Sequence, residues 1–162
     1  MSSRPAPGVI VVFRRTARLM VSELIQRLQA LGYRDVAPAF HAVFENIDHP
    51  AGTRLTELAS RADVTHQSMS ELVGMLEQRG YVRRVADPAD GRARLIRLTS
   101  RGARLRDLGT AQIKQIEQEW QQRWRRAGID TDVRAALQAA LADAEERGSE
   151  LDAGIPPTGD RR

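Results

Sequence analysis

The sequence predicts a mainly helical protein with a small β component, on the basis of three observations. Apolar residues recur at helical spacing through most of the chain. Glycines and prolines separate the helical stretches from one another. Between residues 81 and 99 the pattern changes to two short runs of strand-forming residues around the turn sequence DPADG. The expected fold class is therefore mainly α, of the α+β type, with one β-hairpin.

Length and composition indicate a single domain without thiol chemistry. With 162 residues, of which 41% are hydrophobic, the chain can bury one modest core. It has no cysteine, which excludes disulfides, thiolate metal sites and thiol redox sensing. The longest apolar run, Val9–Phe13, is far shorter than a membrane span, and the N-terminus lacks the ordered regions of a signal peptide. We therefore expect a soluble intracellular protein without a membrane partner.

Positive charge is concentrated in one part of the chain. Nine arginines and two aspartates lie between Arg79 and Arg106, so this stretch carries a charge of +7 within a chain of net charge +4. A basic block in an otherwise slightly acidic protein favours an anionic partner, and nucleic acid is the leading candidate. A solvated charged surface without a partner is the alternative that composition alone leaves open.

Two helices are expected before residue 50. The first covers about Val9–Leu31, after a flexible tail at residues 1–8, and Gly32 ends it. Its apolar stripe consists of Phe13, Met20, Leu24 and Leu28. A second helix is expected at about residues 37–47, because Pro38 suits a first helical turn.

The segment from Leu55 to Gly80 predicts two short helices that cross over a tight turn. The first helix has an apolar face formed by Leu55, Leu58, Ala59 and Ala62. The second has the apolar stripe Met69, Leu72, Val73 and Leu76. Thr65 is suited to cap the second helix with its hydroxyl, and Gly80 to end it in a left-handed conformation. This pattern is a helix-turn-helix, whose second helix can enter the major groove of DNA.

The two strand-forming runs follow directly, at about residues 81–86 and 94–99. The sequence DPADG between them has the proline and glycine of a hairpin turn. A helix-turn-helix followed by a basic hairpin is a winged helix with a two-stranded wing, whose thin arginine-bearing tip fits the narrow minor groove. An ordinary surface hairpin is the alternative, and the adjacent helix pair together with the local charge favours DNA binding over it.

These residues resemble the MarR-type winged helix-turn-helix transcriptional regulators. The similarity covers Leu55–Gly102, and its most specific parts are RGYVRR, DPADGRA and RLTSRG with their relative spacing intact. The resemblance implies an obligate homodimer that binds a pseudo-palindromic operator, usually as a repressor, and that a small ligand releases from DNA. It also implies that Asp90 and Arg92 are the wing aspartate and the wing arginine. In one departure, this chain has Glu71 where many members have a basic residue.

The same resemblance implies a bacterial or archaeal cytosolic protein that is nucleoid-associated when bound to double-stranded DNA.

The apolar stripe of the second helix of the pair faces the core, which leaves its polar face for the major groove. The hairpin supplies arginines for phosphates and for the minor groove. The expected DNA-binding residues are Thr65, His66, Gln67, Ser68, Ser70, Glu71, Arg83, Arg84, Asp90, Arg92, Arg94 and Arg97.

Long helices on both sides of the winged helix predict dimerisation. A helix that ends near Arg126 has Leu105, Leu108, Ile113, Ile116, Trp120 and Trp124 on one side. Thr131 is suited to cap a last helix, whose small apolar face runs from Val133 to Ala144. A second copy of the chain would cover these stripes, and a twofold dimer also matches a palindrome. A monomeric bundle is the alternative.

We therefore expect one domain at residues 9–147 and a disordered tail at 148–162. Within the domain, the DNA-binding lobe covers about residues 53–102, and the dimerisation helices cover about 9–31 and 103–147.

Catalysis is not expected. The histidines at 41, 49 and 66 lack metal-ligand spacing, and no glycine-rich phosphate loop precedes a Lys-Ser/Thr pair. We therefore expect neither a cofactor nor a metal. The second helix supplies His41 and Phe44 as candidate lining residues of a cavity for a small aromatic or amphipathic effector. The alternative, which the sequence favours, is a half-exposed histidine and a core phenylalanine without a ligand. The alternative function is a non-specific architectural DNA-binding protein without an effector, whereas RNA binding is disfavoured because an exposed aromatic platform is lacking.

Overall fold

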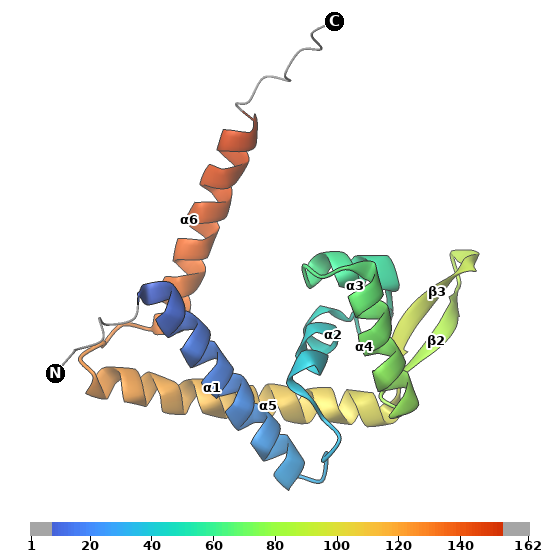
Figure 1. Ribbon diagram of the computed structural model, residues 1–162, viewed down its shortest axis with the longest axis horizontal. Coiled ribbons are helices and arrows are strands. Elements are labelled where there is room, and N and C mark those ends of the chain that lie inside the picture. The colour runs from blue at the N-terminus through green and yellow to red at the C-terminus, as the bar shows by residue number, and fades with distance from the viewer. Residues whose placement is uncertain (1–7, 154–162) are drawn as a thin grey trace, which may run out of the picture. The chain divides into compact units, whose positions relative to one another are not determined.

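The computed structural model describes the backbone of residues 8–153 and the side chains of residues 8–147. The chain divides into two compact units, one that ends at Ile116 and one that begins at Glu117. The elements in order (Figure 1) are α1 (Val9–Ala30), the 3₁₀ turn η1 (Pro38–Phe40), α2 (His41–Asn46), β1 (Thr53–Arg54), α3 (Leu55–Arg61), α4 (His66–Gln78), β2 (Val82–Asp87), β3 (Asp90–Leu98), α5 (Ser100–Arg126) and α6 (Val133–Ala153). The predicted fold class, mainly helical with a small antiparallel sheet, is confirmed.

The helix-turn-helix is formed by α3 and α4, as the apolar spacing predicts. Met69, Val73 and Leu76 are completely buried on the inner face of α4. The hydroxyl of Thr65 accepts a hydrogen bond from the backbone N–H of Ser68 at 3.1 Å, which is the predicted N-cap. Gly80 follows the helix with φ +70°, so it has the left-handed conformation expected of a helix end.

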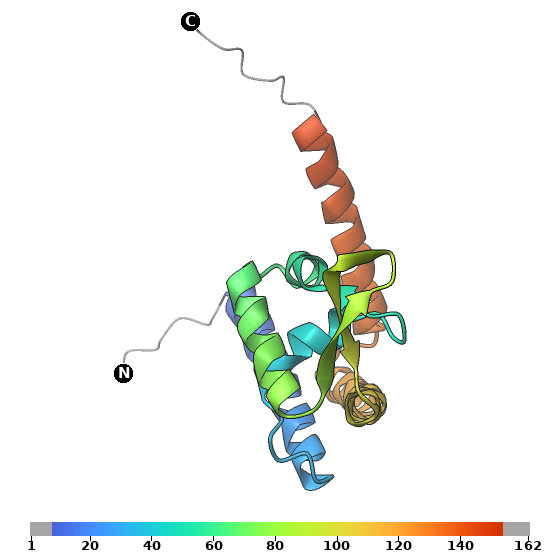
Figure 2. The ribbon, with the colours of Figure 1, turned by 90° about the vertical axis from the view of Figure 1, so that its right-hand side faces the viewer.

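The hairpin formed by β2 and β3, called the wing from here on, is longer than the sequence predicts. Asp90 pairs with Asp87 after a register shift at Ala86, so only Pro88 and Ala89 separate the two strands. Gly91 therefore lies in β3 rather than in the turn. The wing lies beside α4 (Figures 1 and 2), and in Figure 1 its tip extends past α3 and α4.

A third strand, β1, was not expected. It has two residues, Thr53 and Arg54, which pair with Ile96 and Leu95 of β3. The strand order is therefore β1-β3-β2, with the longest strand in the centre. A strand of two residues is too short to show the alternation of polar and apolar side chains from which strands are predicted.

The core of the first unit gathers around Tyr81, at the junction of α4, the wing and α5. The largest fully buried side chains are Tyr81, Phe40, Leu58, Met69, Leu76 and Ile96. Thr99 caps the start of α5: its hydroxyl oxygen accepts the backbone N–H of Gly102 at 3.1 Å and donates to the Gly80 carbonyl at 2.6 Å. Gly102 packs directly against the backbone carbonyl of Tyr81, so α5 starts in contact with the base of the wing.

The second unit contains the last turns of α5 and the helix α6. The rings of Trp120 and Trp124 lie 5.9 Å apart between centroids. The expected cap at Thr131 is wrong: Asp132 caps α6, because its carboxylate accepts the backbone N–H of Ala135 at 3.0 Å. Thr131 instead accepts a hydrogen bond from Gln121 through its backbone carbonyl. Helix α6 continues to Ala153, so residues 148–153 are helical rather than part of a tail, while the expected tails at 1–7 and 154–162 lie outside the described residues.

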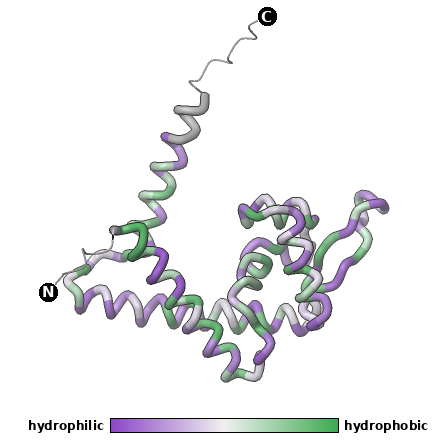
Figure 3. Tube along the Cα trace, viewed as in Figure 1, coloured by the Kyte–Doolittle hydropathy of each residue, from purple (hydrophilic) through white to green (hydrophobic). Residues whose placement is uncertain are grey.

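Several apolar side chains are exposed on the single chain. They include the run from Val9 to Phe13 at the start of α1, which is green in Figure 3, and, in the second unit, Leu137 and Leu141 of α6. The apolar face predicted for α6 is thus present but uncovered. Within the described residues, no helix combines the length and the apolar character that crossing a bilayer demands.

Gly102 provides a test of the junction between α5 and the wing. A Cβ atom at this position would lie 2.0 Å from the Tyr81 carbonyl oxygen, and backbone cannot yield as a side chain does. We expect Gly102→Ala to lower the free energy of unfolding by about 1–3 kcal/mol, as overpacking does in other cores. Urea denaturation followed by circular dichroism measures this change.

Gly74→Ala is the matched control for that experiment. Gly74 also lies within a helix, but a Cβ there meets no atom within 4 Å. We expect this variant to gain about 0.5–1 kcal/mol, because alanine loses less backbone entropy in a helix than glycine does. Equal stability of the two variants would contradict the close packing of Gly102.

Candidate nucleic-acid interface

The outer face of α4 presents polar side chains to solvent because its inner stripe is buried. Thr65, His66, Gln67, Ser68 and Glu71 are exposed, and Ser70 is half-buried. The amide nitrogen of Gln67 donates to the Glu71 carboxylate at 3.2 Å, one helical turn away. His66, Gln67, Ser70 and Glu71 therefore lie on one face of α4, and Thr65 and Ser68 lie at its N-terminal end.

The wing divides its arginines between its two faces, as strand register requires. Arg84 and Arg94 lie on the face shared with the buried Ile96, because Arg84 pairs with Ile96 and Ala86 pairs with Arg94. Arg84 is joined to α4: its guanidinium lies 3.3 Å from the Glu77 carboxylate, which also accepts the Arg84 backbone N–H. This ion pair orients the wing next to the polar face of α4.

Arg83 and Arg97 face each other across the strands on the opposite face of the wing. Arg97 is turned toward the loop before β1, where its Nε donates to the backbone carbonyl of Ala51 at 2.7 Å. Of the predicted phosphate-binding residues, Arg97 is thus half-buried and engaged within the protein. Within the described part of the chain, Arg83, Arg92 and Arg94 are exposed and make no side-chain hydrogen bond or ion pair.

Sequence reasoning singled out Asp90 in the wing and missed Asp87, which is the more deeply buried of the two. Asp87 accepts the backbone N–H of Ala89 at 2.9 Å and two hydrogen bonds from Arg54, at 2.9 and 2.6 Å. The Ala89 N–H and then the Arg54 guanidinium hold the pKa of Asp87 below the ordinary value of 3.8. The sequence signal that could have identified Asp87 is its place in the turn, because an aspartate commonly accepts a hydrogen bond from the backbone N–H two residues later.

Asp90 contributes less to the turn than Asp87. Its carboxylate accepts the backbone N–H of Arg92 at 3.1 Å and lies 3.7 Å from the guanidinium of Arg54. Asp90 therefore fixes the backbone from which the Arg92 side chain extends. Arg54, which the sequence did not single out, contacts both wing carboxylates.

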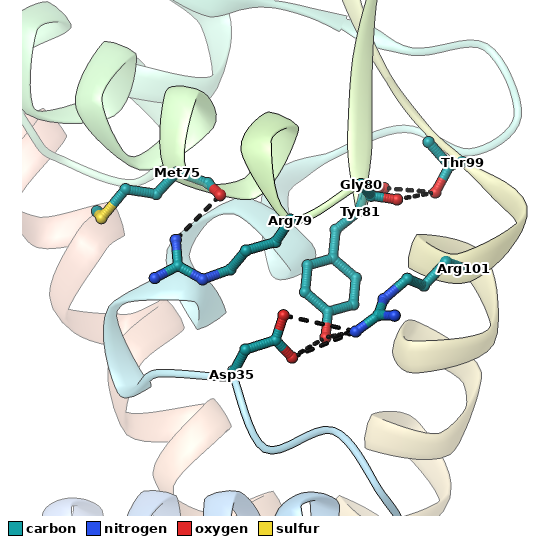
Figure 4. A network of polar contacts seen from close by, with 7 residues as sticks. All are labelled: Asp35, Met75, Arg79, Gly80, Tyr81, Thr99 and Arg101. Carbon is teal, nitrogen blue, oxygen red and sulfur yellow. Dashed lines mark hydrogen bonds and ion pairs between the residues drawn. The ribbon is translucent and has the colours of Figure 1, made fainter.

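At the base of the wing, a polar network around the buried Tyr81 joins three segments that are far apart in the sequence (Figure 4). The Tyr81 hydroxyl donates to Asp35, in the loop after α1, at 2.6 Å. Arg101 of α5 donates to the Tyr81 oxygen at 3.1 Å, and its guanidinium lies 4.7 Å from the centre of the Tyr81 ring. The network thus connects the end of α1 to the wing and to α5.

Proton equilibria at this network follow from the same contacts. Burial alone would raise the pKa of Asp35, but the hydrogen bond from Tyr81 and the charge of Arg101 lower it. Burial and the neighbouring Asp35 carboxylate raise the pKa of Tyr81. Asp35 is therefore ionised and Tyr81 neutral at neutral pH, which keeps the direction of the hydrogen bond fixed.

A cavity of about 270 Å³ lies beside this network, and the predicted effector residues line it. Its walls come from α1, α2 and the first half of α5, and they are mostly apolar. His41 and Phe44 both line it, and His41 lies 2.9 Å from the Glu45 carboxylate. Phe44 meets the Tyr81 ring edge to face at 6.2 Å, so one wall of the cavity contacts the base of the wing.

Among the described residues there is no candidate metal site, because no three acidic or histidine side chains lie close enough together to hold an ion. The polar side chains instead form three clusters: one on α4, one on the wing and one around Tyr81. An exposed polar helix next to an arginine-bearing hairpin is suited to a nucleic-acid duplex, because it offers side chains to base edges and cations to phosphates.

Comparison with known proteins identifies the same region. Residues 35–93 match the sequence model of the MarR family. The transcriptional regulator HosA of Escherichia coli O111:H- is 34% identical over 71 residues, which are 44% of this chain and 53% of HosA. The chain therefore spans about half the length of the curated relative that it matches.

Solved structures resemble the chain over most of its length. One is the MepR–DNA complex of S. aureus, with a TM-score of 0.66 and 19% identity over 88% of this chain and 99% of MepR. Another is CouR from Rhodococcus jostii RHA1 bound to p-coumaroyl-CoA, with a TM-score of 0.61 and 21% identity over 98% of this chain and all of CouR (100%). The resemblance to the MarR family of transcriptional regulators is thus confirmed by the match at residues 35–93, and the solved structures confirm the winged helix-turn-helix fold.

Proposed function

We propose that this chain is a sequence-specific, ligand-responsive repressor that binds a pseudo-palindromic operator as a homodimer. The observation that carries the proposal is the pairing of the exposed polar face of α4 with the free arginines of the wing beside it. The MepR structure, which has the same fold, is a DNA complex, and HosA is named as a transcriptional regulator. The alternative is an architectural DNA-binding protein that lacks both a defined operator and an effector.

In this proposal α4 reads base edges in the major groove. Gln67 can bond bidentately to an adenine, and Ser70 can contact a base or a phosphate. The Glu71 carboxylate holds the Gln67 amide in the free protein, so Gln67 would exchange this hydrogen bond for one to the base. Glu71 thus acts on Gln67 and need not itself touch DNA, which would be repelled by its charge.

The wing supplies the contacts that do not depend on sequence, together with one that depends on groove shape. Arg83, Arg84 and Arg94 are placed to meet phosphates. Arg92, next to the tip, is placed to enter the minor groove, where a narrow groove concentrates negative potential. Arg97 is the weakest candidate, because its guanidinium is already bonded to the Ala51 carbonyl.

Two substitutions separate base reading from phosphate binding. We expect Gln67→Ala to lower affinity for an operator selected from a random pool by about 1–3 kcal/mol, and to leave affinity for random duplex nearly unchanged. Arg94→Ala, at a wing arginine that makes no side-chain hydrogen bond or ion pair in the described residues, should weaken binding to both and reduce the slope of log K against log salt by about 1. Fluorescence anisotropy at several salt concentrations measures these effects.

Arg34→Ala, at an exposed arginine of the loop after α1, is the control for net charge. It should leave both affinities unchanged. If Gln67→Ala weakens operator and random duplex equally, Gln67 is not a reader. If no sequence from the pool binds better than random duplex, the architectural alternative replaces the repressor.

Dimerisation is proposed because apolar helix faces are uncovered on the single chain. In the first unit, the exposed residues from Val9 to Phe13 begin α1, and in the second unit Leu141 of α6 is 60% exposed. Apolar surface of this kind is what a second copy buries, and a twofold axis would place two copies of α4 about one helical turn, ~10 bp, apart on DNA.

Helix α6 offers a test of the dimer that does not disturb the core of the chain. Leu137 is 40% exposed in the single chain, so Leu137→Asp should weaken dimerisation by several kcal/mol while leaving the protomer folded. Sedimentation equilibrium should then show a dimer for the wild type and a monomer for the variant. Gln138→Asp, at the next residue of the same helix, should stay dimeric, and a compact monomeric wild type would refute the proposal.

The effector site is proposed at the cavity lined by His41 and Phe44. Its apolar wall suits an aromatic group, and its volume is near the lower end of the range for ligand pockets. CouR, a protein with a similar fold, was solved with p-coumaroyl-CoA bound. Aromatic acids and their CoA esters are therefore the first probes for this chain. A ligand that displaced Phe44 would disturb Tyr81 at the base of the wing.

Gly109 allows the cavity to be filled from α5. It lines the cavity, and a Cβ there meets no atom within 4 Å, so a leucine side chain has room to occupy the space. We expect Gly109→Leu to keep operator affinity and to abolish release of DNA by any probe that releases the wild type. Anisotropy with aromatic acids and p-coumaroyl-CoA measures release, and undiminished release from the variant would place the effector elsewhere.

A further inference from the structure

Arg54 contacts the wing from the neighbouring strand β1, although its sequence context suggests no role in DNA binding. It lies in the short strand β1 and pairs with Leu95 of the wing strand β3. From there its guanidinium reaches the opposite strand, where Nε and Nη2 both donate to one oxygen of Asp87 at 2.9 and 2.6 Å. Arg54 therefore connects all three strands of the sheet.

Asp87 transmits this contact to the turn. Its second oxygen accepts the Ala89 backbone N–H at 2.9 Å, so each carboxylate oxygen holds a different part of the structure. The Asp87 side chain is only 8% exposed, whereas that of Arg54 is 45% exposed. A carboxylate buried to this extent requires its cationic partner, because without it the desolvated charge would be left uncompensated.

Arg54 also alters the charge that the wing presents. Asp87 and Asp90 are the two acids at the tip, and the guanidinium of Arg54 lies within 4 Å of both, at 2.6 and 3.7 Å. Without Arg54, two negative charges at the tip would oppose the approach of a phosphate backbone. Asp90 in turn holds the backbone N–H of Arg92 at 3.1 Å, so the same cluster fixes the point from which Arg92 extends.

We propose that Arg54 is a positioning residue for DNA recognition, which acts through Asp87 to order the wing turn and to neutralise its acids, and that it makes no contact with DNA itself. This inference rests on the proposed function, because it assigns a role within the DNA-binding site described above.

A double-mutant cycle on DNA affinity tests this role. We expect Arg54→Ala and Asp87→Ala each to weaken duplex binding by about tenfold, and the double variant to be no weaker than either single variant. A direct phosphate contact by Arg54 would cost the same factor whether or not Asp87 is present. Additive losses, or an Arg54→Ala variant that binds as well as the wild type, would overturn the inference.

The salt dependence of binding provides a readout that a mere loss of fold would not reproduce. Arg94→Ala, which removes a proposed phosphate contact, should reduce the salt slope by about 1, whereas Arg54→Ala should leave the slope unchanged while affinity falls. Arg54→Lys keeps the charge but loses the two-pronged hydrogen bond, so its affinity should lie between those of the wild type and Arg54→Ala. A slope reduced equally by Arg54→Ala and Arg94→Ala would make Arg54 a DNA contact and overturn the inference.

Amide hydrogen exchange on the full chain tests whether Arg54→Ala loses affinity because the wing turn becomes less ordered. In Arg54→Ala the amides of Ala89 and Arg92 should exchange faster, while those of the buried stripe of α4 keep their protection. Unchanged exchange at Ala89 would contradict the ordering role. If wild-type protein binds no duplex, the proposed function itself fails; if the wild type binds and the cycle is additive, only the role of Arg54 fails.

Discussion

Tyr81 joins three parts of the winged helix because its backbone and its side chain bond in different directions. Its N–H donates to the Leu76 carbonyl at the end of α4, and its carbonyl accepts the N–H of Thr99 at the start of α5. Gly102 packs against the same carbonyl, while the ring is fully buried. The positions of α4, the wing and α5 relative to one another therefore depend on this residue, and the surface proposed to bind DNA depends on those positions.

The side chain of Tyr81 extends this dependence to the cavity. Its hydroxyl is held by Asp35 and Arg101, and its ring contacts Phe44, which lines the cavity wall. Asp35 directly precedes Val36, which is another lining residue. Closely packed contacts transmit a shift from one residue to the next rather than absorbing it. A molecule in the cavity and a duplex on the wing would therefore act on the same few side chains.

The positive charge of the winged helix is less uniform than the count of arginines indicates. Arg84, Arg101 and Arg106 have acidic partners in Glu77, Asp35 and Asp107. Two more are engaged with backbone carbonyls: Arg79 with Met75 and Arg97 with Ala51. The arginines left free in the described residues include Arg92 and Arg94 near the wing tip. The available charge is thus concentrated on the projecting hairpin, where a duplex can approach it.

The sequence by itself determined the helices, the helix-turn-helix and the existence of the wing, because helical periodicity, caps such as Thr65 and Gly80, and turn residues all act between near neighbours along the chain. It also predicted which face of α4 is exposed, since that follows from the spacing of Met69, Val73 and Leu76. Only the tertiary structure decided that Arg54 belongs to the wing and bonds to Asp87, and that Tyr81, Asp35 and Arg101 form one network. These contacts join residues 33, 46 and 66 positions apart, and such pairings arise from packing between elements, for which a single sequence carries no local signal.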